Sequence, residues 1–332
     1  MDKPLKTMPV HSKPHTKRVL LPASLSRWFD NDTPPPAEGE DIDRIDWLRV
    51  VPFVLMHVAC LGVLWVGVSG IAVGIAVGLY LARMFAITAF YHRYFSHRSF
   101  KTSRFVQFFF AVLGASSVQR GPLWWAGHHR NHHAHSDRSE DAHSPYQLGF
   151  FRSHIGWFLT RRNFVTRTAQ VRDWLVYPEL VFLDRYDTLV PVFLAVFMYF
   201  LGYWLETVAP DLGTDGPQML IWGFFISTVV LYHATFMVNS LAHVWGSQRY
   251  ATKDKSRNNA FLALITLGEG WHNNHHHYPG AVRQGFFWWE FDPTYWILKG
   301  MAVFGLVWDL RPIPESWRQR NRLNSLGLLP RG

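Results

Sequence analysis

The sequence has few charged residues and almost no cysteine. Cys60 is the one cysteine among 332 residues, which excludes a disulfide scaffold and any zinc or iron–sulfur site built from cysteines alone. Charged residues make up 17% of the chain, whereas a typical soluble protein has about 25%. Part of the chain must therefore be nearly free of charge. The first residues also lack the apolar run of a cleaved signal peptide, so we expect none.

Histidine and basic residues are, by contrast, abundant. The chain has 18 histidines beside 24 acidic residues. That number suggests a metal site, but only the spacing of the histidines can support one. Lysine and arginine exceed the acidic residues and give a formal net charge of +9. Attraction to anionic lipid headgroups accounts for this excess, so we expect a lipid bilayer as partner and no nucleic acid.

Four long apolar runs divide the chain into a membrane domain and two tails. They predict spans at about 47–65, 70–90, 189–208 and 218–238. Each run has the roughly 20 residues needed to cross about 30 Å of hydrocarbon. We therefore expect an all-α integral membrane domain over residues 45–312, with the rest of its helices in a cytosolic cap. Residues 1–44 predict a disordered tail, and residues 313–332 a basic C-terminal tail.

The distribution of arginine and lysine predicts the orientation of the spans. Residues 66–69 leave room only for a tight turn, and residues 209–217 contain acidic side chains but no lysine or arginine. Two such connections place the long, arginine-rich loop 91–187 on the opposite side of the membrane. Because lysine and arginine stay in the cytoplasm, we expect this loop and both termini to be cytoplasmic.

Arg83 lies inside the second apolar run, where a charge at the centre of a bilayer is costly. We expect the second helix to continue past the membrane, so that Arg83 reaches the inner headgroups and His92 is carried into the cytosol. The fourth span likewise continues from Val238 into Asn239 and His243.

Four groups of polar residues follow the cytoplasmic ends of the predicted spans. They are His92 and His97; His129, His132 and His133; Asn239 and His243; and His272, His275 and His276. Positions i, i+3 and i+4 share one face of a helix, so each H-x-x-H-H triplet predicts three imidazoles aimed at one point. His92 and His97 are about 140° apart on a regular helix. They either flank a frayed helix end or bind different metals.

The number of grouped imidazoles predicts a site for two metals. Nine histidines are too many for a single ion with about four to six ligands. Imidazole binds zinc, copper, iron and nickel, and ligand type alone does not choose among them.

Nine further histidines receive weaker assignments. His11 and His15 lie in the N-terminal tail and are expected to be incidental. His57 and His233 stand alone inside spans, where we expect hydrogen-bonded packing. The histidines next to the triplets are expected to support ligands or lie on the surface: His128, His135 and His277. The roles of His143 and His154 are left undecided.

The sequence context of the four groups is distinctive. They read H-R-Y-F-S-H-R from His92, H-R-N-H-H from His129, N-S-L-A-H from Asn239 and G-E-G-W-H-N-N-H-H from Gly268. These stretches resemble the histidine boxes of membrane-bound acyl-CoA desaturases, the stearoyl-CoA (delta-9) group most closely. The resemblance covers roughly residues 45–310. Related alkane, sterol and carotenoid hydroxylases share H-x-x-H-H. They generally lack the N-S-L-A-H stretch and the G-E-G-x-H-N stretch.

The resemblance implies a di-iron centre that uses O2 and two electrons to remove two hydrogens from an unactivated acyl chain. It implies that the nine grouped histidines are direct ligands and that Asn239 binds through a water or weakly. It further implies that Asp137 or Glu269 accepts the second N–H of a ligand imidazole. Glu269 has an alternative role, capping the helix that carries His272.

Substrate and electron donor follow from the same resemblance. The substrate would be a fatty acyl-CoA or another acyl carrier, and the donor a separate protein such as a ferredoxin, a rubredoxin or a cytochrome b5-type protein. Candidates for the walls of an acyl tunnel are Trp124, Trp125, Trp271, Phe108 and Phe109. Candidates for a phosphate-bearing headgroup are Arg161, Arg162 and Arg167. The alternatives are packing or interfacial anchoring for the aromatic residues, and attraction to anionic lipid for the arginines.

Two other functions compete with desaturation. A histidine-box hydroxylase would deliver oxygen to the chain instead of removing a second hydrogen. A membrane metal-binding or transport protein would need ionisable residues deep within the spans. Arg49 and Glu206 lie near span ends; deeper in the spans, besides Arg83, there are only His57 and His233, so transport is disfavoured.

Overall fold

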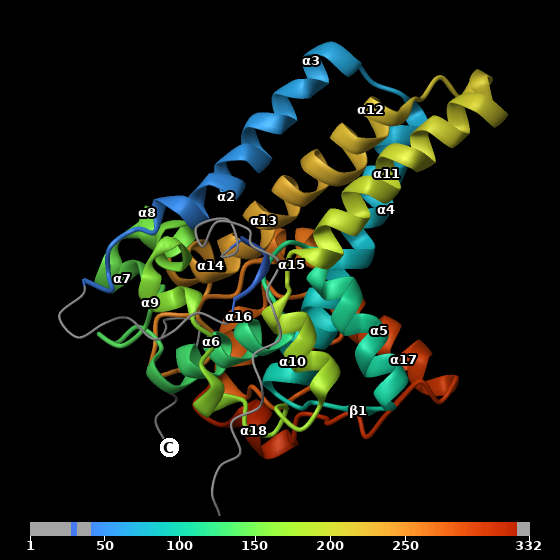
Figure 1. Ribbon diagram of the computed structural model, residues 1–332. Coiled ribbons are helices and arrows are strands. Elements are labelled where there is room, and N and C mark those ends of the chain that lie inside the picture. Colours follow the sequence, from blue (N-terminus) through green and yellow to red (C-terminus); the bar gives the residue numbers. More distant parts are fainter. Residues whose placement is uncertain (1–27, 32–40, 324–332) are drawn as a thin grey trace, which may run out of the picture.

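A computed structural model describes residues 28–31 and 41–323 of the chain. Four segments long and apolar enough to cross a membrane project from a cap of shorter helices (Figure 1). They are Trp47–Val66, Gly70–Ser96, Leu189–Val208 and Gly216–Val244. This architecture confirms the predicted all-α fold with four spans. Most of the predicted tail 1–44, and residues 324–332 of the C-terminal tail, lie outside the described residues.

Three of the spans contain more than one helical element. The first comprises α2 (Trp47–Ala59), the 3-10 turn η1 (Cys60–Gly62) and α3 (Val63–Val66). The second joins α4 (Gly70–Phe85) to a π-helix, η2 (Ala86–Ser96). The third is α11 (Leu189–Val208). The fourth comprises α12 (Gly216–Met219), the π-helix η6 (Leu220–Ile226), α13 (Ser227–Asn239) and α14 (Leu241–Val244).

Short polar signals determine where the spans begin. The Ser69 hydroxyl accepts the Ala72 N–H at 3.1 Å and starts α4. Asp215 accepts the Gln218 N–H at 2.7 Å and starts α12. Gly67 precedes α4 at φ 66°, in the left-handed region that favours glycine. Both short connections lie at the end of the bundle away from the cap, as predicted (Figure 1).

Large apolar side chains cover the outer surfaces of the spans. Leu64, Trp65 and Phe193 are 76%, 81% and 71% exposed. An exposed apolar surface of this extent needs a lipid environment.

Arg83 does not reach the headgroups. Its side chain is fully buried, and its Nη1 donates to Thr228 Oγ1 at 2.7 Å and to the Ser116 carbonyl at 3.2 Å. Its Nη2 donates to the Ser227 hydroxyl. The predicted extension of Arg83 to the membrane surface is therefore wrong, because hydroxyls of the fourth span satisfy the guanidinium inside the bundle.

The cap consists of short helices and one two-stranded antiparallel sheet. Its α-helices are α5 (Arg104–Ala115), α6 (Pro122–His135), α7 (Pro145–Leu148), α8 (Phe150–His154), α9 (Arg161–Phe164), α10 (Pro178–Arg185), α15 (Ala260–Ile265), α16 (His272–His277), α17 (Pro293–Val303) and α18 (Glu315–Gln319). Its 3-10 turns are η3 (Gly156–Leu159) and η4 (Thr168–Gln170); a further turn, η5 (Pro210–Leu212), lies between the third and fourth spans. The strands β1 (Lys101–Thr102) and β2 (Val307–Trp308) pair Lys101 with Trp308.

Helix α6, which carries one H-x-x-H-H triplet, is fixed at its start by α10. Asp184 accepts the Trp124 N–H with Oδ1 at 2.7 Å and the Thr166 hydroxyl with Oδ2 at 2.6 Å. A Cβ at Gly121 would lie 2.4 Å from Asp184 Cα, so only glycine permits this approach. Burial raises the pKa of Asp184 to about 6.

Candidate metal centre

The structure gathers the nine predicted histidines into two clusters. We call His92, His97, His129, His133 and His275 cluster one, and His132, His243, His272 and His276 cluster two. Within each cluster, one ring nitrogen from every residue lies within 4.8 Å of the others. Each cluster thus draws on separate parts of the chain, and each has enough imidazoles to hold a metal ion.

The two H-x-x-H-H triplets do not each converge on one point, contrary to the prediction. On α6, His129 and His133 belong to cluster one and His132 to cluster two. On α16 the division is reversed, with His275 in cluster one and its two companions in cluster two. Successive residues are about 100° apart around an α-helix, so adjacent histidines face different directions. Both helices therefore lie between the clusters and supply both.

His92 and His97 share one cluster because His92 lies on the π-helix η2 and His97 directly follows its last residue. The His97 N–H donates to the His92 carbonyl at 3.3 Å, an i to i−5 hydrogen bond. This winding brings the two ring centroids to 4.9 Å. The two histidines therefore bracket the end of the second span, as one predicted alternative had it, but that end is a π-helix and is not frayed. The other alternative, two different metals, does not agree with their shared cluster.

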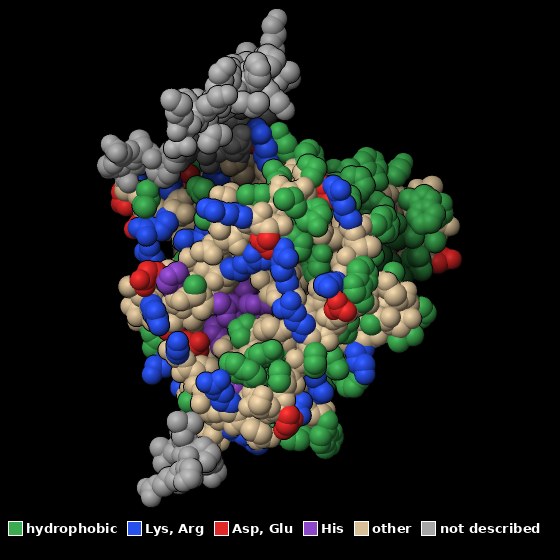
Figure 2. Space-filling model, turned by 90° about the horizontal axis from the view of Figure 1, so that it is seen from below, with side chains coloured by type: hydrophobic (Ala, Val, Ile, Leu, Met, Phe, Trp, Pro, Cys, Tyr) green, Lys and Arg blue, Asp and Glu red, His purple; other side chains and the backbone are tan. Residues whose placement is uncertain are grey.

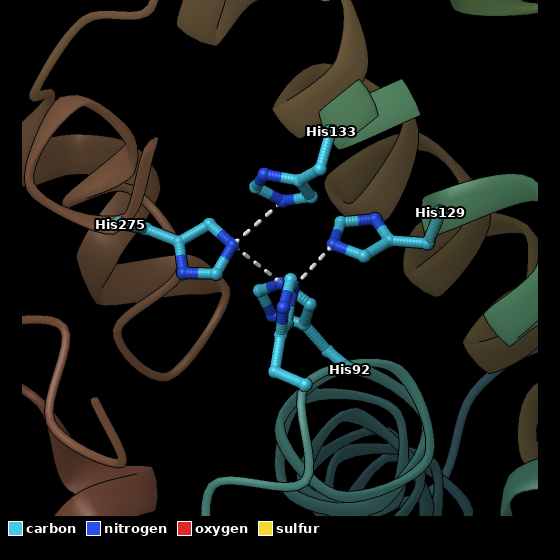
Figure 3. Close-up of side chains that lie close together, drawn as sticks. His92, His129, His133 and His275 are labelled. Carbon is cyan, nitrogen blue, oxygen red and sulfur yellow. Dashed lines mark hydrogen bonds between the residues drawn. The ribbon is translucent and has the colours of Figure 1, made fainter. Parts of the chain in front are cut away.

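The ring nitrogens of cluster one are spaced as ligands of one ion. His275 Nε2 lies 3.0 Å from His92 Nε2 and 2.9 Å from His133 Nε2. His97 Nε2 lies 2.9 Å from His129 Nε2. Ligands at right angles and about 2.1 Å from an ion would be about 3.0 Å apart. Figure 3 shows the labelled rings of cluster one pointing toward a common centre.

Cluster two contains a buried nitrogen that has no protein partner. His243 Nε2 and His272 Nε2 are 3.1 Å apart. His276 Nε2 is buried and has no hydrogen-bond partner among the described residues. A buried polar atom left unpaired is costly, and a bound ion would satisfy it. The donor sets of both clusters therefore fit metal ions.

Carboxylates contact the Nδ1 atoms of four cluster histidines. Asp137 Oδ2 lies 3.0 Å from His243 Nδ1, and Glu269 contacts His92 Nδ1. These are the two carboxylates that the resemblance suggested. Helix α16 has no side-chain cap at its first turn, so the alternative capping role of Glu269 is not observed. A carboxylate in this position fixes the ring orientation and the tautomer of its histidine.

Two further carboxylates were missed by sequence reasoning. Asp141 Oδ2 lies 3.0 Å from His132 Nδ1, and Asp254 Oδ2 lies 2.8 Å from His276 Nδ1. Asp141 follows the first triplet closely enough to have been a candidate. Nothing near Asp254 in the sequence indicates its role, because the loop that carries it reaches the cluster only in the folded chain.

Burial and mutual repulsion keep most cluster histidines neutral. Burial lowers the pKa of His97, His129, His133, His272 and His275 well below the usual value, and neighbouring histidines lower it further. His132 differs, because the Asp141 carboxylate outweighs burial and raises its pKa. Metal ligation requires the neutral imidazole, so the protonation state of these histidines suits an ion.

An apolar cavity of about 390 Å³ opens onto both clusters. His92 and His129 of cluster one, and His132 and His272 of cluster two, line it. From there the cavity extends between the spans, where its wall includes Met56 of α2, Met84 of α4, Ala195 of α11 and Phe224 of η6. An extended alkyl group in this cavity would lie beside the cluster nitrogens.

The structure places the predicted contact residues unequally. Trp124, Trp125 and Asn239 line the cavity. Trp271 does not, and its indole N–H donates to the Phe291 carbonyl at 2.8 Å. Phe108 and Phe109 are 40% and 54% exposed and lie outside the cavity wall.

The basic candidates also lie outside the cavity wall. Arg162 pairs with Asp43 at 2.7 Å, and Arg161 lies 4.0 Å from Asp46. Arg167 Nε donates to His128 Nδ1 at 3.3 Å, and His128 is a buried residue of the cavity wall.

The clusters can also be reached from the surface of the cap. Figure 2 shows histidine side chains at the bottom of a hollow on the cap face, with lysine and arginine side chains around it. The acyl-sized cavity and this hollow therefore approach the histidines from different directions.

Asp141→Asn is expected to weaken metal binding at cluster two. Removing the negative charge behind His132 makes the imidazole a poorer ligand, and loss of such a partner costs about 10–100-fold in metal affinity. Competition with a graded chelator would measure the change. Glu140→Gln is the matched control, since Glu140 is exposed, belongs to neither cluster and accepts a hydrogen bond from Ser139. Equal affinities in both variants would contradict the role of Asp141.

The family model and the relatives described here carry the names of fatty acyl desaturases. A family model described as "Fatty acid desaturase" matches residues 68–310. The "sn-2 palmitoyl-lipid 9-desaturase" of Nostoc sp. (strain 36) is 35% identical over 269 residues, which cover 80% of this chain and 90% of the relative. The "Delta-9 acyl-lipid desaturase 1" of Arabidopsis thaliana is 34% identical over 283 residues, covering 83% and 87%.

A third relative is named for an acyl-CoA substrate and for position 5. The "Acyl-CoA 5-desaturase AL21" of Anemone leveillei is 34% identical over 290 residues, covering 83% of this chain and 85% of the relative. The relatives thus differ in acyl carrier and in position, but they share one reaction. With four apolar helices and two histidine clusters that fit metal ions, this chain belongs to the membrane fatty acid desaturase family.

Proposed function

We propose that this desaturase inserts a double bond into a saturated fatty acyl chain at a di-iron centre, one ion in each histidine cluster. The observation that carries the proposal is the shared cavity, because His92 and His129 of cluster one line the same apolar wall as His132 and His272 of cluster two. All nine cluster histidines would be direct ligands. Asn239, on the cavity wall beside them, would bind through a water.

Iron would supply the redox chemistry that attacks an aliphatic C–H bond, which has no acidic proton for a general base. Zinc has no such redox chemistry and would not support the reaction. Each double bond consumes one O2, two electrons and two protons and releases two waters. The protein holds a CH2–CH2 unit against the clusters and excludes bulk water with apolar walls that include Trp124 and Trp125.

We propose acyl-CoA as the carrier of the acyl chain and delta-9 as the position of the double bond, as the sequence resemblance implies. The names of the relatives support both carriers, since some act on acyl lipids and others on acyl-CoA. An assay must therefore offer the same saturated chain in both forms.

A separate electron donor would dock over the hollow in the cap. The basic side chains around this hollow favour an acidic partner such as a ferredoxin, a rubredoxin or a cytochrome b5-type protein (Figure 2). We also propose that the cap and both termini face the cytoplasm, because the arginine-rich loop lies on that side of the spans.

Gas chromatography with mass spectrometry of lipids from cells that express the protein tests the proposal. We expect a new monounsaturated acid that depends on O2, with its double bond at carbon 9. Feeding a labelled acyl-CoA or a labelled lipid to membranes identifies the carrier. If hydroxylated chains were the only product, the result would contradict desaturation and support the competing hydroxylase function.

Ala195→Phe is expected to shorten the acyl chain that the enzyme accepts. Ala195 lines the cavity between the spans, away from the histidines, and overfilling such a space costs about 1–3 kcal/mol. Turnover of the longest substrate should fall about tenfold relative to shorter ones, as measured by the product profile. Val196→Phe is the control, because Val196 is 49% exposed on the outer surface of the same helix. An unchanged profile in Ala195→Phe would contradict this path for the chain.

A further inference from the structure

Three histidines outside the metal clusters form a hydrogen-bonded chain. His57 of α2 contacts His233 of α13 through their Nε2 atoms at 3.2 Å. His233 Nδ1 lies 3.0 Å from His154 Nε2 at the end of α8. His154 Nδ1 lies 2.9 Å from the Ser240 hydroxyl. His233 turns a different nitrogen to each neighbour, so the three rings form a line and do not surround an ion.

Both ends of this chain meet backbone carbonyls. His57 Nδ1 lies 2.8 Å from the Phe53 carbonyl, and Ser240 Oγ lies 3.1 Å from the Phe236 carbonyl. A carbonyl only accepts hydrogen bonds. The chain therefore makes five contacts, from Phe53 to Phe236, and each contact needs one hydrogen.

The neutral chain has one hydrogen too few. Three neutral imidazoles supply one N–H each, and Ser240 supplies one O–H. Four hydrogens serve five contacts, so all contacts are made only when the chain carries one additional proton. The geometry thus provides a place for one additional proton, although none of the three rings forms an ion pair with another described residue.

The state without the extra proton is also well bonded. The Phe53 carbonyl requires the hydrogen of His57 to be on Nδ1, so His57 Nε2 accepts from His233 and His233 Nδ1 accepts from His154. Ser240 then turns its hydroxyl to His154. The Phe236 carbonyl still accepts a hydrogen bond from the Ser240 backbone N–H at 3.1 Å. A single hydroxyl rotation therefore separates the two states.

The surroundings make the extra proton exchangeable. Burial and the neighbouring His233 lower the pKa of His154, so His154 releases a proton readily. His154 is only half-buried, which gives access to water. The ionisable side chains nearest the far end are Tyr232, stacked on His57 with centroids 6.3 Å apart, and Cys60, which bonds the Met56 carbonyl at 3.4 Å.

The chain ends beside the cavity of the metal centre. Ser240 is fully buried and directly follows Asn239, a residue of the cavity wall. Phe53, Phe158 and Phe236, which pack on the histidine rings or on one another, line the same cavity. The chain thus runs behind one wall of the cavity, and its last member, Ser240, directly adjoins Asn239 of that wall.

We propose that His57, His233 and His154 hold one exchangeable proton and pass it through Ser240 into the cavity during O2 reduction. The inference rests on the proposed function, because the reduction of one O2 to two waters takes up two protons besides the two hydrogens of the substrate. The proton comes from water at His154, resides on the three rings, and leaves at the Asn239 side. The three histidines act as positioning and proton-holding residues and do not touch the acyl chain.

The first test measures the proton itself. Infrared spectra of the purified holoenzyme with ring-labelled histidine should show an imidazolium band in the wild type that is lost in His233→Phe. His135→Gln is the control, since the His135 ring hydrogen-bonds the Asn131 carbonyl and lies outside the three-histidine chain, and it should keep the band. An identical imidazolium band in the wild type and His233→Phe would overturn the proposal. This measurement does not depend on desaturation, so it separates the two proposals.

The second test measures proton supply during turnover. In His154→Gln and His233→Gln, we expect turnover to fall about tenfold at about pH 6 and to match the wild-type rate at about pH 9, because the lowered pKa of His154 empties the wild-type chain of its extra proton at high pH as well. Iron content and KM should stay unchanged. A loss equal at every pH, or accompanied by loss of iron, would show a structural role and overturn the proposal.

Discussion

His275→Ala is expected to abolish desaturation. His275 Nε2 contacts the ring nitrogens of both His92 and His133, so its loss opens cluster one from the side of α16. Loss of a partner behind a ligand already costs about 10–100-fold, so loss of the ligand itself should cost more than about 100-fold in turnover. The metal content should fall by one ion per chain, because His272 and His276 still serve cluster two. Product analysis and elemental analysis of the same preparation measure both effects.

The matched control removes a histidine from the same part of the cap. His135→Ala changes a ring on α6 that hydrogen-bonds the Asn131 carbonyl and belongs to neither cluster. It should retain both metals and nearly full activity. A fully active His275→Ala variant, or one that keeps both ions, would contradict the assignment of cluster one.

Arg93→Met is expected to cause the largest loss of stability. The Arg93 guanidinium is 1% exposed and lies 3.1 Å from Glu269 and 3.0 Å from Asp292. It also donates to the Val282 carbonyl at 2.8 Å. Its removal leaves two buried carboxylates without their cation, and breaking a buried pair in this way costs about 3–5 kcal/mol. Thermal unfolding in detergent should show a markedly lower Tm.

An exposed arginine on the same stretch provides the control. Arg98 pairs with Asp173 at 2.6 Å but its side chain is 48% exposed, and such pairs contribute about 0–1 kcal/mol. Arg98→Met should therefore shift the Tm little. Equal shifts for the two variants would show that burial of the Arg93 network does not stabilise the cap.

The spans were predictable from the sequence because a bilayer imposes a simple rule on length and polarity. The third span, residues 189–208, has the predicted bounds. The second and fourth spans extend past the predicted ends, to Ser96 and Val244, because their helices continue into the cap. The rule did not predict the position of the Arg83 side chain. Its partners, Ser227 and Thr228, come from another span, and no local pattern announces that contact.

The identity of the cluster histidines was also predictable, but their division was not. Spacing at i, i+3 and i+4 places His129, His132 and His133 near one helix face. Which cluster each ring joins depends on where α6 lies between the clusters, and that is a property of the packed cap. The π-helix that unites His92 with His97 is equally invisible, because the sequence of η2 contains no proline or glycine to mark the change of winding.

The histidine chain from His57 to Ser240 could not be predicted from the sequence either. Each of its histidines looked like an isolated packing residue or had no assigned role in the sequence. Only the folded chain brings α2, α8 and α13 together. The missing hydrogen in that chain then follows from the contacts, without any further assumption about the reaction.

The most direct test of the account is the metal content of the purified wild-type protein. We expect two iron ions per chain by elemental analysis, with iron-57 Mössbauer spectra that show two histidine-ligated sites. We propose two ions because the nitrogens of each cluster lie close enough together to hold one metal ion. One ion per chain, or zinc in both sites of an active preparation, would contradict the account.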